Sequence, residues 1–238
     1  MSGHSKWSTI KRAKGAADAK RSQLFTKLAK AVAVAARDGA DAAMNPKLRL
    51  AIDRARSFSM PKDSIERAIQ KGSGAGEGTK LEEVRYEAYG PGGVALLIDA
   101  LTDNRNRTSA EVRHLLERHG GRLADAGSVA WMFVIKGVVQ IAAPPNREEL
   151  ELLLIEVGAD DINEQDGELL ITCPPEALED IKELLTSKNI APAYLSLEPV
   201  AKTNTAVDDQ NAADKLNELR EALDNNDDVT NIYDNEAG

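Results

Sequence analysis

The sequence is poor in the residues from which disulfide frameworks, metal centres and catalytic clusters are built. Its 238 residues include one cysteine, Cys173, and three histidines. A single cysteine excludes an internal disulfide framework and fits a reducing compartment, so the expected location is the cytoplasm. His114 and His119 are five residues apart, off the one-turn spacing that puts two metal ligands on one helix face. With no nucleophile–base pair, metal cluster or carboxylate pair evident, we expect neither an enzyme nor a cofactor.

Long apolar runs are also missing. No stretch approaches the roughly 20 apolar residues that span a bilayer, and the N-terminus lacks the apolar segment of a secretory signal. Hydrophobic residues nevertheless make up 42% of the chain, enough for packed domains. We expect folded domains and no membrane partner.

What the sequence does have is charge, divided unevenly along the chain. Residues 1–71 hold 16 Lys and Arg against 6 Asp and Glu, a net charge of +10, whereas residues 72–238 hold 14 against 33, a net charge of −19. The total of −9 conceals this division. A basic end on an acidic chain predicts an anionic partner held by one module, because the acidic remainder repels that partner.

The cations of the basic end are the candidates for contact with nucleic acid. The alternative is that they only solvate a helix surface, as most charge runs do. Phosphate contacts supply affinity but little sequence information. Trp7 could stack on an unpaired base or pack as a lid on the helices. The candidate residues here are Lys6, Trp7, Lys11, Arg12, Lys14, Lys20, Arg21, Lys27 and Lys30.

Apolar spacing predicts three short helices in this basic region. The first runs from about Leu24 to Ala36 and stops at Gly39, with Lys27, Lys30 and Arg37 on a charged arc separate from the apolar stripe. Asn45-Pro46 begins the second helix, and Pro61 begins the third at its first helical position, with Gly72 as its end. Three amphipathic helices of this length predict one small bundle.

The glycine-rich stretch 72–78 predicts a linker, and the periodicity changes after it. A strand is expected at 94–101, a helix at 110–119 and a strand at 129–135. From Gly137 the expected order is β-α-β-β-α-β, a ferredoxin-like arrangement. Its strands are expected at 138–142, 161–165, 168–173 and 193–199, and its helices at 147–157 and 175–188, with an Asp166-Gly167 hairpin turn.

The last two expected elements are a helix at 212–223 and a strand at 229–233. A lone helix and strand cannot bury their own apolar faces, so they are expected to return to the sheet begun at Val94. The predicted fold class is α+β and multidomain, with an N-terminal three-helix bundle followed by two α+β domains, the last inserted into the middle one. The predicted domains are 1–77, 78–136 with 203–238, and 137–202.

A second candidate anion site follows the strand expected at 94–101. In the run Asp103–Thr108, Arg105 and Arg107 lie near an expected helix start, where free N–H groups attract phosphate. Simple capping by Asn106 or Thr108 is the alternative. The stretch Gly90–Gly93 lacks the Gly-Lys-Ser/Thr ending of a nucleotide-binding loop and is expected to be a turn.

Several stretches together resemble one known family. They are Gly3–Trp7 with Ile10-Lys11, Phe25–Leu28, Asn45-Pro46, "MPKDSIERAI" at 60–69, "YGPGGVALLIDALTDNRNRT" at 89–108, "GGRLADAGSVAWMF" at 120–133 and "DDVTNIYDN" at 227–235. Over essentially the whole chain, this pattern resembles the YebC family. One departure is Ala31-Val32, where members commonly carry Glu-Ile, which makes that face more basic.

The resemblance implies three domains, the first helical and the third inserted into the second. Bacterial members are usually described as probable cytoplasmic transcriptional regulators that bind DNA, mitochondrial relatives as translational activators, and some bacterial members as ribosome-associated elongation helpers. We therefore expect a non-catalytic nucleic-acid-binding regulator. A DNA target, a ribosomal or transfer RNA target on the ribosome, and a protein-interaction scaffold remain the alternatives. The oligomeric state and the target sequence are not predicted.

Overall fold

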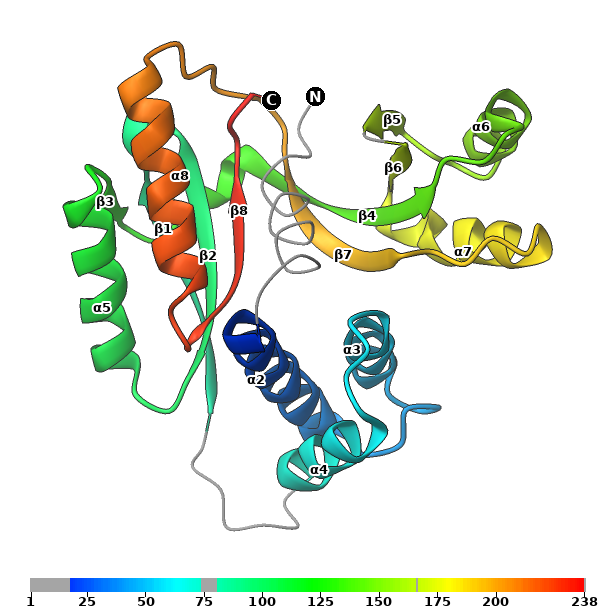
Figure 1. Ribbon diagram of the computed structural model, residues 1–238, viewed down its shortest axis with the longest axis horizontal. Coiled ribbons are helices and arrows are strands. Elements are labelled where there is room, and N and C mark those ends of the chain that lie inside the picture. Colours follow the sequence, from blue (N-terminus) through cyan, green and yellow to red (C-terminus); the bar gives the residue numbers. More distant parts are fainter. Residues whose placement is uncertain (1–17, 74–80, 166, 238) are drawn as a thin grey trace. The chain divides into compact units, whose positions relative to one another are not determined.

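The computed structural model describes residues 18–73, 81–165 and 167–237 (Figure 1). These residues form two compact units. One is the inserted unit, residues 134–200. The other contains a helical lobe, residues 18–73, and a sheet lobe, residues 81–133 and 201–237.

The helical lobe consists of α2 (Asp18–Ala35), α3 (Pro46–Ser57) and α4 (Lys62–Gly72). The Asn45 side chain caps α3 by accepting a hydrogen bond from the Leu48 backbone N–H at 3.1 Å. The three helices share one core, so the predicted bundle is confirmed. The fully or largely buried members of this core are Leu28, Val32, Ala36, Leu48, Ile52, Ala55, Met60, Ile65 and Ala68.

Two residues at the ends of α4 show how the bundle is closed. Pro61 has an extended ψ of 140°, so it flanks the helix as its N-cap, and the predicted start at Pro61 is one residue early. At the other end, a Cβ built on Gly72 would lie 1.9 Å from the carbonyl oxygen of Ala33. Glycine is therefore required there because the backbones of α2 and α4 meet.

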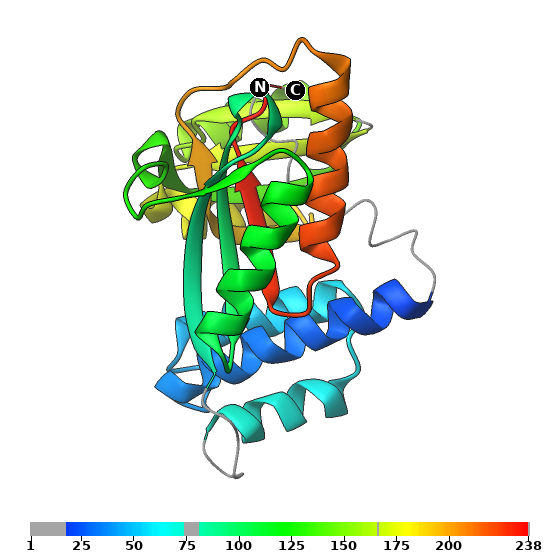
Figure 2. The same cartoon turned by 90° about the vertical axis from the view of Figure 1, so that its left-hand side faces the viewer.

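The sheet lobe is built on four antiparallel strands in the order β3-β1-β2-β8. The strands are β1 (Glu82–Tyr89), β2 (Ala95–Thr102), β3 (Arg122–Ala124) and β8 (Val229–Asp234). Helices α5 (Arg105–Arg118) and α8 (Gln210–Asp224) cover one face (Figures 1 and 2). The prediction that the C-terminal helix and strand return to this sheet is confirmed.

Three predictions for the sheet lobe need correction. Strands β1 and β3 were not predicted, although in β1 Val84, Tyr86 and Ala88 alternate toward the core with exposed or half-buried neighbours. Helix α5 begins at Arg105 rather than at 110, because Asn104 caps it. The strand predicted at 129–135 is a short 3-10 turn, Ala130–Met132, followed by β4. Gly90–Gly93 is a turn as predicted, with positive φ at Gly92 and Gly93.

The inserted unit has the predicted β-α-β-β-α-β order. Its elements are β4 (Phe133–Ala142), α6 (Arg147–Glu156), β5 (Asp161–Gln165), β6 (Glu168–Cys173), α7 (Leu178–Ser187) and β7 (Tyr194–Ala201). The strand order β5-β6-β4-β7 is that of a ferredoxin-like sheet. Gln165 and Glu168 pair across the predicted hairpin. One of the two turn residues, Gly167, lies within the described part of the chain and has a φ of 79°.

Strand β4 carries the chain from one unit into the other. Two strands were predicted here, at 129–135 and 138–142, with Gly137 between them. One strand runs through Gly137 instead. A Cβ on Gly137 would lie 2.5 Å from the Cys173 Sγ, so glycine allows β4 to pack closely beside Cys173. The glycine therefore marks close packing here, whereas the prediction treated it as a break.

Candidate functional site

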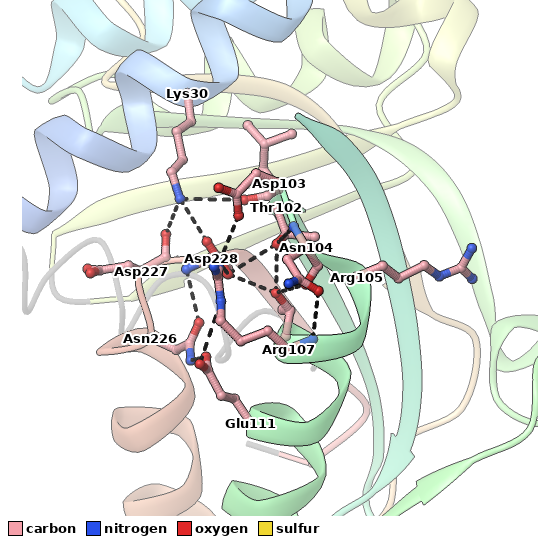
Figure 3. Close-up of polar contacts among 12 residues, drawn as sticks. Lys30, Thr102, Asp103, Asn104, Arg105, Arg107, Glu111, Asn226, Asp227 and Asp228 are labelled. Carbon is pink, nitrogen blue, oxygen red and sulfur yellow. Dashed lines mark hydrogen bonds and ion pairs between the residues drawn. The ribbon is translucent and has the colours of Figure 1, made fainter. Parts of the chain in front are cut away.

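A buried carboxylate, Asp228, lies at the centre of the densest polar cluster of the sheet lobe (Figure 3). It belongs to the turn between α8 and β8, and the exposed fraction of the residue is 6%. Its Oδ2 accepts hydrogen bonds from Arg107 at 2.6 Å, Thr108 at 2.7 Å and Thr102 at 3.2 Å. Its Oδ1 accepts from the Lys30 ammonium at 3.0 Å. One carboxylate thus joins β2, α5 and α2.

The electrostatics of this cluster keep Asp228 ionised. Burial by itself raises the pKa of a carboxyl group, but hydrogen bonds from Arg107, Thr108 and Lys30, with the Lys30 charge, outweigh it and lower the pKa of Asp228 to about 2. The cations are matched in turn, since Arg107 also pairs with Asp103 at 3.0 Å. The cluster is therefore charge-balanced within the chain.

Lysines of α2 reach this turn from the helical lobe. Lys30 Nζ donates to the Asp227 carbonyl at 2.9 Å as well as to Asp228. One turn earlier, Lys27 Nζ donates to the Asp224 carbonyl and pairs with its Oδ1 at 3.2 Å. Burial lowers the pKa of Lys27, and the charge and hydrogen bond of Asp224 offset part of that effect. The α8–β8 turn, counted from Asp224, the last residue of α8, therefore holds two of the cations that the sequence assigned to nucleic acid.

The prediction that Lys27 lies on a charged arc of the first helix, separate from the buried stripe, is therefore wrong. The exposed fraction of this residue is 8%, and it lies beside the buried Leu28. The acidic partners lie about 200 residues further along the chain, so helical spacing alone gave no sign of them. Any role for Lys27 and Lys30 in binding nucleic acid stays a prediction.

The two arginines at the start of α5, Arg105 and Arg107, point in different directions (Figure 3). Asn104 caps the helix by accepting from the Arg107 N–H at 3.1 Å, so the predicted capping by Asn106 or Thr108 is wrong. Arg107 points into the Asp228 cluster, whereas Arg105 points away from it (Figure 3). Arg105 is exposed, and within the described ranges its guanidinium has no hydrogen-bond or ion-pair partner. Arg105 is therefore the one of this pair whose guanidinium is unpaired among the described residues, whereas Arg107 is exposed but already paired with carboxylates.

The remaining predicted contacts cannot be placed in this way. Lys6, Trp7, Lys11, Arg12 and Lys14 lie outside the described residues. Lys20 and Arg21 belong to the first turn of α2, where the backbone alone is described. These assignments stay predictions.

Sequence reasoning did not find Asp224 and Asp228 as partners of α2. Both belong to the acidic C-terminal region, for which the sequence predicted no contact with the basic end. Asp228 is 126 residues from Thr102 and 198 from Lys30. Only the run "DDVTNIYDN", noted for its family resemblance, marked this turn as unusual.

No group of three His, Cys, Asp or Glu side chains in the described part of the chain is arranged to hold a metal ion. Within the same residues, no helix has both the length and the apolar character needed to cross a bilayer.

Fold and site together define a class: an α+β protein with a three-helix N-terminal part, a middle sheet closed by the C-terminus, and an inserted ferredoxin-like part. A family model described as the TACO1/YebC protein N-terminal domain matches residues 5–75. A second, described as the TACO1/YebC second and third domain, matches residues 81–236. The chain belongs to the TACO1/YebC family, which confirms the resemblance found in the sequence.

Individual relatives agree with this assignment. A protein of Pseudothermotoga lettingae is 48% identical over 238 residues, 99% of this chain and 93% of its own length. One of Koribacter versatilis is 44% identical over 236 residues, 99% and 95% of the two chains. Both are named "Probable transcriptional regulatory protein". The crystal structure of a conserved hypothetical protein from Aquifex aeolicus matches with a TM-score of 0.85 at 40% identity, covering 92% and 91% of the two chains.

Proposed function

We propose that this protein is a non-catalytic regulator of gene expression that binds nucleic acid through its basic N-terminal region. The observation that carries the proposal is the density of cations at residues 6–21. Six Lys and Arg stand there against one acid, Asp18. Such a segment neutralises phosphates along a nucleic-acid backbone and releases their counterions.

The names of the relatives support the regulatory part of the proposal, since both of those quoted above are called probable transcriptional regulatory proteins. The contacts of the helical lobe support the choice of residues. Lys27 and Lys30 are already paired with the α8–β8 turn, so the cations before them carry most of the phosphate contact. Arg105 offers a further contact from the sheet lobe.

RNA is the second candidate target, and Trp7 favours it. An indole among lysines can stack on an unpaired base, which single-stranded and looped RNA present and a continuous DNA duplex does not. A DNA regulator, by contrast, needs side chains that reach base edges or a dimer matched to half-sites. Within this proposal the names of the relatives, which refer to transcription, favour DNA, and the chemistry of Trp7 favours RNA.

The proposal is tested by measuring affinity for a 30-base-pair DNA duplex and for a structured RNA with unpaired loops, by fluorescence anisotropy between 50 and 200 mM salt. With about five phosphates neutralised, duplex binding should weaken a few hundredfold across this range. Replacing the six cations Lys6, Lys11, Arg12, Lys14, Lys20 and Arg21 by Gln should remove most of the affinity and reduce the salt slope by about five.

The matched control removes six exposed cations from the surface of α3 and α4. The control residues are Lys47, Arg49, Arg56, Lys62, Arg67 and Lys71, all changed to Gln. Equal losses in the two variants would mean that net charge alone drives binding, contrary to the proposal. A salt-independent affinity, or none for either nucleic acid, would leave the scaffold alternative. Trp7→Ala should weaken RNA binding by about tenfold and leave duplex binding nearly unchanged if RNA is the target.

A further inference from the structure

The helical lobe and the sheet lobe are joined in an unusual way. The core of the helical lobe contains only residues of 24–69, and the two clusters of the sheet lobe contain only residues of the sheet lobe. None of these clusters of described residues includes apolar side chains from both lobes. The two lobes are therefore separate hydrophobic bodies that meet through other contacts.

The space between them is hollow. A cavity of about 1020 Å³ lies between α2 and α3 on one side and the sheet on the other. Apolar side chains line both of its walls, among them Leu24 and Phe58 from the helices and Leu101 and Ile232 from the strands. A close-packed joint would fill this volume. Separation of the lobes would therefore break fewer packing contacts than separation of a close-packed joint.

Hydrogen bonds from cations bridge the gap. Lys27 and Lys30 donate to the α8–β8 turn, as described above. Arg54 donates to the Asn231 side chain at 3.1 Å, and Arg37 donates to the Leu81 carbonyl. In all four contacts the donor is a cation of the helical lobe and the acceptor is an oxygen of the sheet lobe. Two of the four, the Lys27 and Lys30 contacts, are ion pairs, which salt screens in proportion to their exposure to solvent.

The acceptors of the two lysines resemble the oxygens of a phosphate chain. Asp224 pairs with Lys27, and Asp228 pairs with Lys30. Because the two lysines are one helical turn apart on α2, the two carboxylates face α2 at a similar spacing. Burial makes the Lys27 ammonium less stable than in water, as its lowered pKa indicates. The closed arrangement thus carries a desolvation cost that an exposed phosphate contact would avoid.

We propose that Lys27 and Lys30 form a covered phosphate-binding site, which the α8–β8 turn occupies in the closed molecule and a nucleic-acid backbone occupies after the lobes separate. The proposal rests on the proposed function and adds its regulation. The acidic turn and the polyanion compete for the same two ammonium groups. Weakening the ion pairs between the turn and these two lysines should therefore tighten binding of the polyanion, because it shifts the population toward the open form.

The test variant is Asp224→Asn, because the Asp224 side chain is half exposed and pairs with Lys27. Its matched control is Asp227→Asn, which removes the same charge from the same turn, where the Asp227 contact to Lys30 is made by the backbone carbonyl. Asp224→Asn should bind the 30-base-pair duplex or the loop-containing RNA about fivefold more tightly than Asp227→Asn. In a Lys27→Gln background this difference should vanish, because the competing pair is gone.

Opening is measured without nucleic acid by energy transfer between dyes at Met44→Cys on the helical lobe and Lys215→Cys on α8, both exposed positions. Cys173 is buried and burial raises its thiol pKa to about 11, so it should take up little dye. Transfer efficiency should shift with salt and with Asp224→Asn, and less with Asp227→Asn, because the Asp227 charge acts on Lys27 more weakly than that of Asp224.

Three outcomes would count against these ideas in different ways. Equal affinities of the two Asn variants, with wild-type binding intact, would overturn the covered site alone. An energy transfer that responds to neither salt nor Asp224→Asn would also overturn it. A wild-type protein that binds neither nucleic acid would overturn the proposed function, and the energy transfer would still report whether the joint opens.

Discussion

The two four-stranded sheets of this protein are stabilised by different means. The sheet of the inserted unit, β5-β6-β4-β7, is made from one continuous stretch of chain, and its core is apolar and tightly packed around Cys173 and Gly137. The sheet β3-β1-β2-β8 receives its last strand from more than 100 residues away and ties it down with buried charge at Asp228. The inserted unit has buried polar contacts too, among them the hydrogen bond from the Tyr194 hydroxyl to Glu198, but the returning strand of the sheet lobe is preceded by a carboxylate that gathers four donors.

The largest effect should come from filling the close approach in the inserted unit. In Gly137→Ala, the new Cβ would lie 2.5 Å from Cys173 Sγ and 3.0 Å from Leu178, which should lower the free energy of unfolding by about 3 kcal/mol. Hydrogen-exchange mass spectrometry should show lost protection in β4 and β6, with β1 and β2 unchanged. Adding Cys173→Ala should restore part of the loss, and no rescue would argue against close packing as the cause.

A smaller effect, dependent on pH, should follow from Asp228→Asn. The pKa of Asp228 is lowered from 3.8 to about 2 in the folded protein, so its ionised form stabilises the fold above about pH 4. That contribution, about 2 kcal/mol, should disappear as the pH falls from about 4 to 2. Denaturant unfolding at several pH values should show this slope in the wild type and lose it in Asp228→Asn. A variant that keeps the slope would assign it to another carboxylate.

The smallest effect should come from the cap that begins α5. Asn104→Ala removes the acceptor of the Arg107 N–H and should cost about 1 kcal/mol. Asn106→Ala changes the same residue type two positions on, where the structure makes no cap, and should cost less than half as much. Thermal unfolding measures both variants, and equal losses would contradict the assignment of the cap.

The secondary-structure predictions were more accurate for the inserted unit than for the sheet lobe. In the inserted unit, both helices and the hairpin of β5 and β6 follow from local spacing and an Asp-Gly turn, and the structure has them at the predicted places. In the sheet lobe, β1 was missed although its alternation is visible in Val84, Tyr86 and Ala88. No element was predicted over this charge-rich stretch, and its partner β2 supplies the hydrogen bonds that make it a strand.

The residues of the candidate site also differ in how well the sequence predicted them. Arg105 could be selected from the sequence because its exposure depends on its place at a helix start. The engagement of Lys27 and Lys30 could not, because their partners lie at Asp224 and Asp228. Charge counts identify how many cations a region holds, and only packing identifies which of them the protein itself neutralises.

The sequence by itself determined the existence of the helices, the Asn45 cap of α3, the hairpin and the division of charge, since each depends on interactions within one or two turns of chain. It also sufficed to indicate the family. The tertiary structure alone decided that the last strand pairs with β2, that Asp228 gathers donors from three elements, and that two lysines face inward. These features join residues 100 to 200 positions apart, and no local preference specifies such a contact until the chain has folded.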